Sequence, residues 1–259
     1  MNNRFALLLL GIVLLSGLFS CGKTVLTATG KQYIMDATEA PLTDSIIYYA
    51  TEPFRSNLQA TMSEVLCTSS KPMEKGNPEG RLGDFVSEIC LVEGNATMRE
   101  LGADSLVADF VVLNNGGLRK PLPKGDITLG DLYEVMPFEN RLVLIEMDGT
   151  SVQALCDFIA AINGTPVSGI RFFIDKKDSS ATGISIGDNT LQIDKDYLVL
   201  TADYLANSGD KFPFTKLGKV KLDTGLKIRD ALISHCRKQG ELKKEISYEP
   251  DGRISYANQ

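Results

Sequence analysis

Strand patterns and amphipathic helices alternate irregularly along this sequence, and that alternation limits the folds it can adopt. Apolar residues recur at helical spacing from Leu82 to Cys90 and from Val152 to Ile159. Short apolar runs bounded by turn-forming residues predict strands at 108–113, 142–147, 170–174, 184–193 and 197–202. Because this order mixes hairpins with crossovers, we expect an α+β fold, a mixed β-sheet with packed helices, rather than a doubly wound parallel sheet.

Local signals predict where several elements begin, break and end. Residues 44–66 have helical character that Pro53 is expected to interrupt, and 67–80 is rich in loop-forming residues. Thr128 and Asp131 have the spacing of a capping box at a helix start. A last helix is expected over 228–236, followed by a short hairpin turned at 250–252.

The first twenty residues have the composition of a secretory signal. Arg4 precedes an apolar run from Phe5 to Leu15, which is too short for a stable transmembrane anchor. The run ends in Leu18-Phe19-Ser20-Cys21, which resembles the lipobox of bacterial lipoproteins. We therefore expect residues 1–20 to be a signal peptide, 21–41 a tether and 42–259 one domain. Ordinary secretion, with Cys21 incidental, is the alternative.

Lipidation of Cys21 would place the protein in the bacterial cell envelope, on the periplasmic side or the outer-membrane surface. Removal of residues 1–20 takes away Arg4 and no acidic residue, so the formal net charge moves from −6 to −7. An acidic chain disfavours non-specific binding of nucleic acid, so no nucleic-acid partner is expected.

Four cysteines remain after Cys21. Cys90 and Cys156 fall on apolar helical faces, which favours buried free thiols at both positions. Oxidation of an exported chain leaves three possible pairings open for Cys67, Cys90, Cys156 and Cys236. No pair has the spacing of metal ligands.

A single histidine restricts the chemistry that these residues can perform. His235 lies late in the last predicted helix, where it reads as an exposed or partly packed side chain. No Gly-x-Ser-x-Gly elbow or Walker sequence is present, and di-metal phosphoesterases need several His and Asp ligands. We expect no metal site or other cofactor in this chain, and no autonomous metal-dependent hydrolysis.

Three segments carry residues suited to a ligand site. Residues 114–119 read Asn-Asn-Gly-Gly-Leu-Arg, a turn with exposed backbone N–H groups and an arginine suited to phosphate. Residues 135–140 hold Phe138 directly after Pro137, and 201–210 leave a strand through Tyr204 toward a Gly-Asp turn. Each segment alone is more often an ordinary turn or a core aromatic than a site.

Together and in this order, the segments resemble the C-terminal domain of the 5′-nucleotidase and UDP-sugar hydrolase family. Gly125-Asp126-Ile127-Thr128 and Ser168-Gly169-Ile170 also match family turns, and the resemblance covers about residues 45–255. In that family two aromatic rings sandwich the nucleobase. The resemblance assigns these rings to Phe138 and Tyr204, with Tyr204 replacing the commoner Phe.

The same resemblance implies the remaining substrate contacts. Asp210, in the Gly209-Asp210 pair, maps to the acid that contacts the sugar hydroxyls, and Asn114 to a base-side hydrogen-bonding residue. Arg119, after Gly116 and Gly117, maps to a phosphate-side cation. A further family arginine has no clear counterpart: Arg81 stands close to the expected position but out of register.

The family's N-terminal metallophosphatase domain has no counterpart in these residues. We therefore expect the nucleotide-binding half of a split 5′-nucleotidase in nucleotide catabolism, with divalent metals held by a separately encoded metallophosphoesterase. A non-catalytic nucleotide or nucleoside capture lipoprotein is the alternative, and a degenerate structural domain is a third interpretation.

Overall fold

The computed structural model describes residues 45–257, and those from Thr51 onward form one compact unit. The predicted signal peptide, Cys21, the tether and the boundary at 42 lie outside the described residues. Helix α2 spans Ser45–Met62 and contains Pro53. The predicted interruption at Pro53 is wrong. Pro53 cannot donate to the carbonyl of Tyr49, four residues earlier, and Tyr49 is exposed, so water can satisfy that carbonyl.

A two-stranded antiparallel sheet follows, formed by β1 (Val65–Ser69) and β3 (Gly125–Thr128). The predicted loop at 67–80 is therefore wrong at its start, because β1 continues to Ser69. Helix α4 (Leu129–Val135) begins directly after β3, with the capping box that the sequence predicts. Thr128 Oγ1 accepts the N–H of Asp131 at 3.1 Å, and the Asp131 carboxylate accepts the N–H of Thr128 at 2.9 Å.

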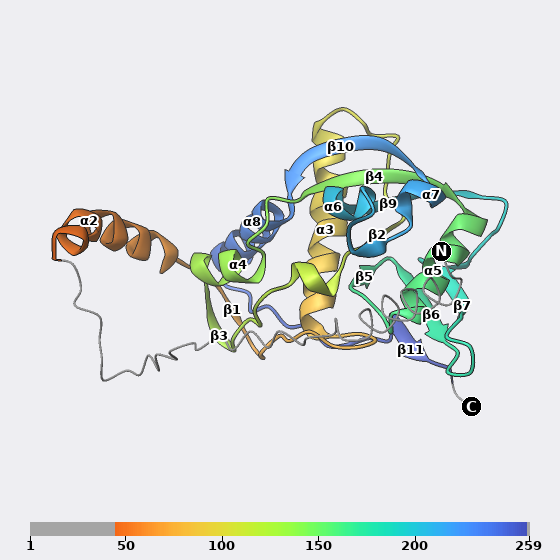
Figure 1. Ribbon diagram of the computed structural model, residues 1–259, viewed down its shortest axis with the longest axis horizontal. Coiled ribbons are helices and arrows are strands. Elements are labelled where there is room, and N and C mark those ends of the chain that lie inside the picture. Colours follow the sequence, from red (N-terminus) through yellow and green to blue (C-terminus); the bar gives the residue numbers. More distant parts are fainter. Residues whose placement is uncertain (1–44, 258–259) are drawn as a thin grey trace, which may run out of the picture. The chain divides into compact units, whose positions relative to one another are not determined.

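The central sheet has five strands in the order β10-β4-β9-β2-β5. Its members are β2 (Phe110–Val112), β4 (Arg141–Asp148), β5 (Val167–Ser168), β9 (Asp196–Ala202) and β10 (Lys219–Lys227). Strands β2 and β9 pair in parallel and the other neighbours pair antiparallel. Helices and mixed sheets together confirm the predicted α+β class (Figure 1).

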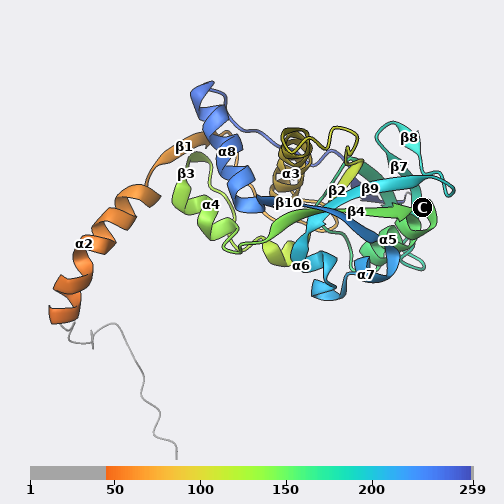
Figure 2. The same ribbon diagram turned by 90° about the horizontal axis from the view of Figure 1, so that it is seen from above.

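Helices cover both faces of this sheet. Helix α3 (Arg81–Glu100) lies along one face, while α5 (Gly149–Ala161), α6 (Asp203–Ala206) and α7 (Phe214–Leu217) lie on the other (Figure 2). Helix α8 (Ile228–Glu241) packs against α3 and β1. Leu82, Phe85 and Ile89 of α3 are fully buried, as their spacing predicts. No helix among residues 45–257 is long and apolar enough to cross a bilayer.

A second sheet has the order β11-β6-β7-β8. Its strands are β6 (Ile170–Ile174), β7 (Ala181–Ile186), β8 (Asn189–Thr190) and β11 (Ile254–Tyr256). The predicted C-terminal hairpin is wrong, since β11 pairs in parallel with β6 instead of turning back on its own neighbour. The predicted strand at 184–193 is also divided, because Gly187 with φ 55° turns the chain between β7 and β8.

All four cysteines in the described part of the chain are buried and free. This confirms the prediction for Cys90 and Cys156, whose thiol pKa values are raised by burial. A hydrogen bond between neighbouring thiols lowers the pKa of Cys67 and raises that of Cys236. None of the three possible pairings is formed here.

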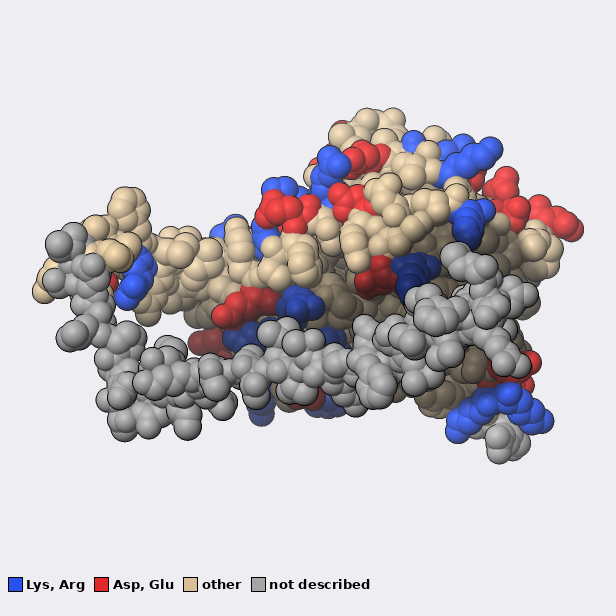
Figure 3. All heavy atoms as spheres, in the orientation of Figure 1, with Lys and Arg blue, Asp and Glu red and all other residues tan. Residues whose placement is uncertain are grey.

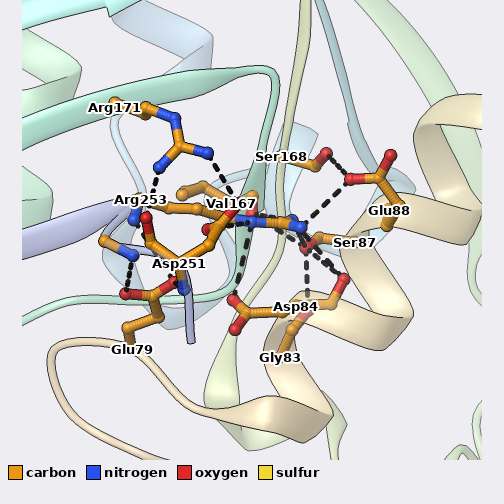
Figure 4. Close-up of polar contacts among 11 residues, drawn as sticks. Glu79, Gly83, Asp84, Ser87, Glu88, Val167, Ser168, Arg171, Asp251 and Arg253 are labelled. Atoms are coloured by element: carbon orange, nitrogen blue, oxygen red, sulfur yellow. Dashed lines mark hydrogen bonds and ion pairs between the residues drawn. The ribbon is translucent and has the colours of Figure 1, made fainter. Parts of the chain in front are cut away.

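A buried arginine fastens the C-terminal strand to α3 (Figure 4). Arg253 donates to the Val167 carbonyl at 2.9 Å and forms an ion pair with Glu88 at 3.1 Å. Glu79 accepts the N–H groups of residues 251, 252 and 253 at 3.0–3.2 Å. Together these contacts hold β11 against the start of α3, far away in sequence.

Asp84 lies within this network as a weakly compensated acid. It is buried, and its Oδ2 has no hydrogen-bond partner among the described residues. Burial, with the nearby Glu79 carboxylate, raises the pKa of Asp84 to about 7, while Arg253, 3.9 Å away, opposes the rise. The folded protein therefore retains a proton on Asp84 over a pH range in which the unfolded chain has lost it.

This difference predicts a pH-dependent gain in stability for Asp84→Asn. Stability from the protonated acid is fully present below the ordinary aspartate pKa and is lost as pH rises through about 7. Relative to wild type, the free energy of unfolding of Asp84→Asn should therefore rise between pH 5 and pH 8, by on the order of 2 kcal/mol. Urea titrations of both proteins at the two pH values measure it, and parallel pH profiles would contradict the assignment.

Candidate nucleotide site

Strand order brings the three predicted segments to one edge of the central sheet. Because β2 and β9 are parallel neighbours, the turn after β2 and the segment after β9 leave the same edge. Strand β4 runs antiparallel to β9, with Leu142 opposite Ala202, so the loop before β4 arrives at that edge as well. Residues separated by some ninety positions in sequence, such as Asn114 and Tyr204, therefore lie side by side.

A cavity of about 290 Å³ lies between these segments. It is lined by Asn114, Gly116, Gly117, Arg119, Phe138, Asn140, Tyr204 and Asp210. Seven of the eight binding residues predicted from sequence are in this lining, and the eighth, Gly209, lies against the Tyr204 ring. A volume near 300 Å³ is at the small end of the range for small-molecule sites.

Phe138 and Tyr204 reach the cavity from different loops. Their residues are 43% and 46% exposed, so neither is sealed in the hydrophobic core. In the part of the chain that the structure describes, neither ring contacts another aromatic ring. Half-exposed rings lining a shared cavity have the properties needed to stack on a flat heterocycle.

A hydrogen-bonded chain joins three of the lining side chains. Asn114 donates from Nδ2 to Oδ2 of Asp210, and the Tyr204 hydroxyl donates to Oδ1 of Asp210 at 2.9 Å. Asn114 is nearly buried whereas Asp210 is exposed. The carboxylate is thus held at the rim of the cavity by partners on either side.

The Gly116-Gly117 turn is compact because both glycines face the Asn114 amide. A Cβ would lie 3.1 Å from Asn114 Nδ2 at Gly116 and 3.0 Å from Asn114 Oδ1 at Gly117, tighter than ordinary contact. The turn uses the N–H groups of Gly117 and Leu118 internally, at 3.2 and 3.3 Å. These two amides are therefore engaged within the turn and are not presented to an anion as the sequence suggests.

Arg119 supplies a cation at the cavity. It is exposed, and its guanidinium makes one long hydrogen bond of 3.4 Å, to the Gly116 carbonyl. The backbone N–H of Arg119 donates to the Val135 carbonyl at 2.8 Å. This bond connects the glycine turn to the loop that carries Phe138. Arg81 is not at the cavity; it pairs with Glu249 at 2.7 Å.

A buried arginine from α8 holds the Phe138 loop. Arg229 donates to the carbonyls of Met136 and Pro137 at 3.2 and 3.1 Å, and its guanidinium lies 4.2 Å from the centre of the Tyr133 ring. It also pairs with Glu139, which Lys227 contacts as well. Hydrogen bonds from these two cations lower the pKa of Glu139, so the loop carries a stable carboxylate.

Sequence reasoning missed Asn140 and Arg229. Asn140 lines the cavity two residues after Phe138, and its side chain has no hydrogen-bond partner in the described chain. Its place at the end of the Pro-Phe loop was the available signal. No local pattern identifies Arg229, whose role depends on α8 packing against a loop ninety residues earlier.

His235 and the acidic side chains outside the cavity are not grouped into a metal cluster in the described residues. His235 is partly buried, packs edge-on against Phe85 and has a pKa lowered by burial. No group of three His, Cys, Asp or Glu residues within 45–257 could hold a metal ion. On the face drawn in Figure 3, acidic and basic side chains are interspersed.

Comparison with known proteins agrees with this geometry. Residues 60–217 match the family described as "5′-nucleotidase, C-terminal domain". The endonuclease YhcR of Bacillus subtilis is 31% identical over 175 residues, 64% of this chain and 14% of the relative. A 5′-nucleotidase of Vibrio parahaemolyticus is 28% identical over 157 residues, 58% of this chain and 27% of the relative.

Among solved structures, a 5′-nucleotidase precursor from Thermus thermophilus superposes with a TM-score of 0.67 at 25% identity. The match covers 83% of this chain and 44% of that one. The chain thus spans less than half the length of each of these three relatives.

The contacts of the Phe138 loop predict that replacing Arg229 and replacing Lys227, the two cations that bind Glu139, change the free energy of unfolding by different amounts. Arg229→Met removes hydrogen bonds to the buried Met136 carbonyl and to the partly buried Pro137 carbonyl, and should lower the free energy of unfolding by about 1–3 kcal/mol. Lys227→Met removes only an exposed ion pair and should leave that free energy nearly unchanged, because water screens such pairs. Urea unfolding measures both, and equal losses would show that Arg229 does not clamp the loop.

Proposed function

The chain belongs to the 5′-nucleotidase C-terminal domain family, and from this premise we propose that it binds a nucleoside monophosphate in the cavity between Phe138 and Tyr204. The observation that carries the proposal is the convergence of seven family-matched residues on one cavity. The base stacks on the two rings, the ribose meets Asp210 and the phosphate meets Arg119. Asn114 and Asn140 are placed to hydrogen-bond the ligand's polar edges.

Hydrolysis of the phosphate ester needs chemistry that these residues do not supply. The sequence has one histidine, and His235 is packed away from the cavity against Phe85. The donor set therefore does not fit a di-metal phosphoesterase centre, which gathers several His and Asp ligands. We propose that a separately encoded metallophosphoesterase holds the divalent metals and that this chain presents the substrate to it in nucleotide catabolism.

Presentation of substrate contributes by orientation. A bound nucleotide held by two rings, a carboxylate and an arginine has lost most of its rotational freedom before it meets the metals. Such orientation can supply several kcal/mol of a reaction barrier. A lipid anchor on Cys21 would confine the pair of proteins to the envelope surface, which is the location that we propose.

Stacking predicts the effect of removing either ring. Phe138→Ala and Tyr204→Ala should each weaken AMP binding by about 5- to 150-fold, which corresponds to about 1–3 kcal/mol per stacked base. Phe173→Ala is the matched control, since Phe173 is 47% exposed and outside the cavity. Isothermal titration calorimetry measures all three. Unchanged binding in both cavity variants would place AMP elsewhere.

Arg119 should distinguish nucleotide from nucleoside. Arg119→Ala should weaken AMP binding by about 10- to 100-fold, because a hydrogen bond to a charged group contributes about 1.5–3 kcal/mol, and should leave adenosine binding unchanged. Lys120→Ala is the control, since Lys120 is exposed, pairs with Glu134 and does not line the cavity. Equal losses for AMP and adenosine in Arg119→Ala would contradict a phosphate contact.

The split-enzyme proposal is tested with the partner present. Co-expression with a metallophosphoesterase encoded beside this chain should raise AMP hydrolysis in the presence of Mn²⁺ or Zn²⁺, through a higher rate or a lower KM than the partner alone shows. Phe138→Ala should abolish that gain. AMP binding without any gain would support a capture protein instead, and absence of binding would support a degenerate domain.

A further inference from the structure

Tyr204 does more at the cavity than present a ring. A phenylalanine would offer the same stacking face, yet here the ring carries a hydroxyl that is used. The hydroxyl donates to Asp210 Oδ1 at 2.9 Å and accepts the N–H of Asp210 at 3.3 Å. The hydroxyl is therefore hydrogen-bonded to both the side chain and the backbone of Asp210.

The segment around Asp210 needs such support. Ser208, Asp210 and Lys211 have φ values of 67°, 50° and 62°, all in the left-handed region that disfavours residues with a Cβ. Asp210 itself is exposed, so neighbouring packing does little to hold its side chain. Hydrogen bonds must therefore fix the orientation of its carboxylate.

Gly209 brings the ring close enough to do this. A Cβ at Gly209 would lie 2.5 Å from Cε1 and Cζ of Tyr204, so the ring rests directly on the glycine backbone. The ring's edge then reaches Asp210, while Asn114 holds the other carboxylate oxygen from the opposite side. Each carboxylate oxygen has two lone-pair directions, so each can still accept one further hydrogen bond.

A carboxylate fixed in this way, with one acceptor direction open on each oxygen, matches two adjacent hydroxyl groups. We propose that the Tyr204 hydroxyl is a positioning group that orients Asp210 toward the vicinal diol of a ribose, so that the site selects ribonucleosides over nucleosides lacking that diol. This inference rests on the proposed nucleotide site. It separates two roles of one residue, since the ring stacks on the base and the hydroxyl sets sugar selectivity.

The ribose contact gives the inference a specific readout. A site built to hydrogen-bond hydroxyl groups rejects an analogue that lacks them, because its polar groups are left unpaired. Wild-type protein should therefore bind adenosine more tightly than 2′,3′-dideoxyadenosine. A hydroxyl that served only loop stability would affect both ligands alike.

The test is calorimetric titration of the full chain with these two nucleosides. Tyr204→Phe should weaken adenosine binding about 10-fold, the size of one hydrogen bond to a charged group, and leave dideoxyadenosine within about twofold of wild type. Tyr204→Ala should weaken both. In an Asp210→Asn background, Tyr204→Phe should cause no further loss of adenosine affinity, because the two groups act as a unit.

Tyr256→Phe is the matched control, since its hydroxyl donates to Asn163 at 2.6 Å and it lies in the second sheet, outside the cavity lining. It should leave both affinities unchanged. If Tyr204→Phe leaves adenosine binding intact, or weakens both nucleosides equally, the inference is wrong while the proposed site stands. If wild-type protein binds neither nucleoside, the proposed site and this inference fail together.

Discussion

The pairing of β9 with β2 on one side and with β4 on the other is the constraint on which the candidate site depends. Parallel pairing with β2 places the glycine turn and the Tyr204 segment at one edge, and antiparallel pairing with β4 returns the Phe138 loop to it. Most residues of these three strands are buried and helices cover both faces of the sheet, so a one-residue slip would move every core side chain to the opposite face. Register of the core therefore determines the spacing of the two rings, although neither ring belongs to the core.

Two buried arginines hold the Phe138 loop and the C-terminal segment in place. Arg229 holds the carbonyls before Phe138, and Arg253 joins β11 to α3 through Glu88 and to β5 through the Val167 carbonyl. Both act between segments far apart in sequence, and each donates to carbonyl oxygens as well as to carboxylates. In the Phe138 loop, Arg229 thereby satisfies the carbonyl groups of Met136 and Pro137. The cavity is thus lined by segments that leave the edge of the sheet, and directed hydrogen bonds hold those segments in place.

Much of this could be predicted from sequence, for reasons specific to each element. The spacing of Leu82, Phe85 and Ile89 predicts α3, and Thr128 with Asp131 predicts the start of α4, because these signals are local. Strand β10 was missed because the alternation of Val220 and Leu222 with lysines ends at Asp223, after only two apolar residues. Strand β11 was assigned to a hairpin because its partner β6 lies some eighty residues away. The cavity residues were found through their order along the chain. Asn140 and Arg229 required the structure, since only packing shows which side chains reach the loop.

Family membership, strand order and the open lining of the cavity support the proposal that a nucleobase binds between Phe138 and Tyr204. The most direct measurement is a crystal structure of the protein grown with saturating AMP. Density for the base is expected between the two rings, with the ribose at Asp210 and the phosphate toward Arg119. AMP ordered at any other place on the surface, or a cavity that stays empty at saturating AMP, would contradict it.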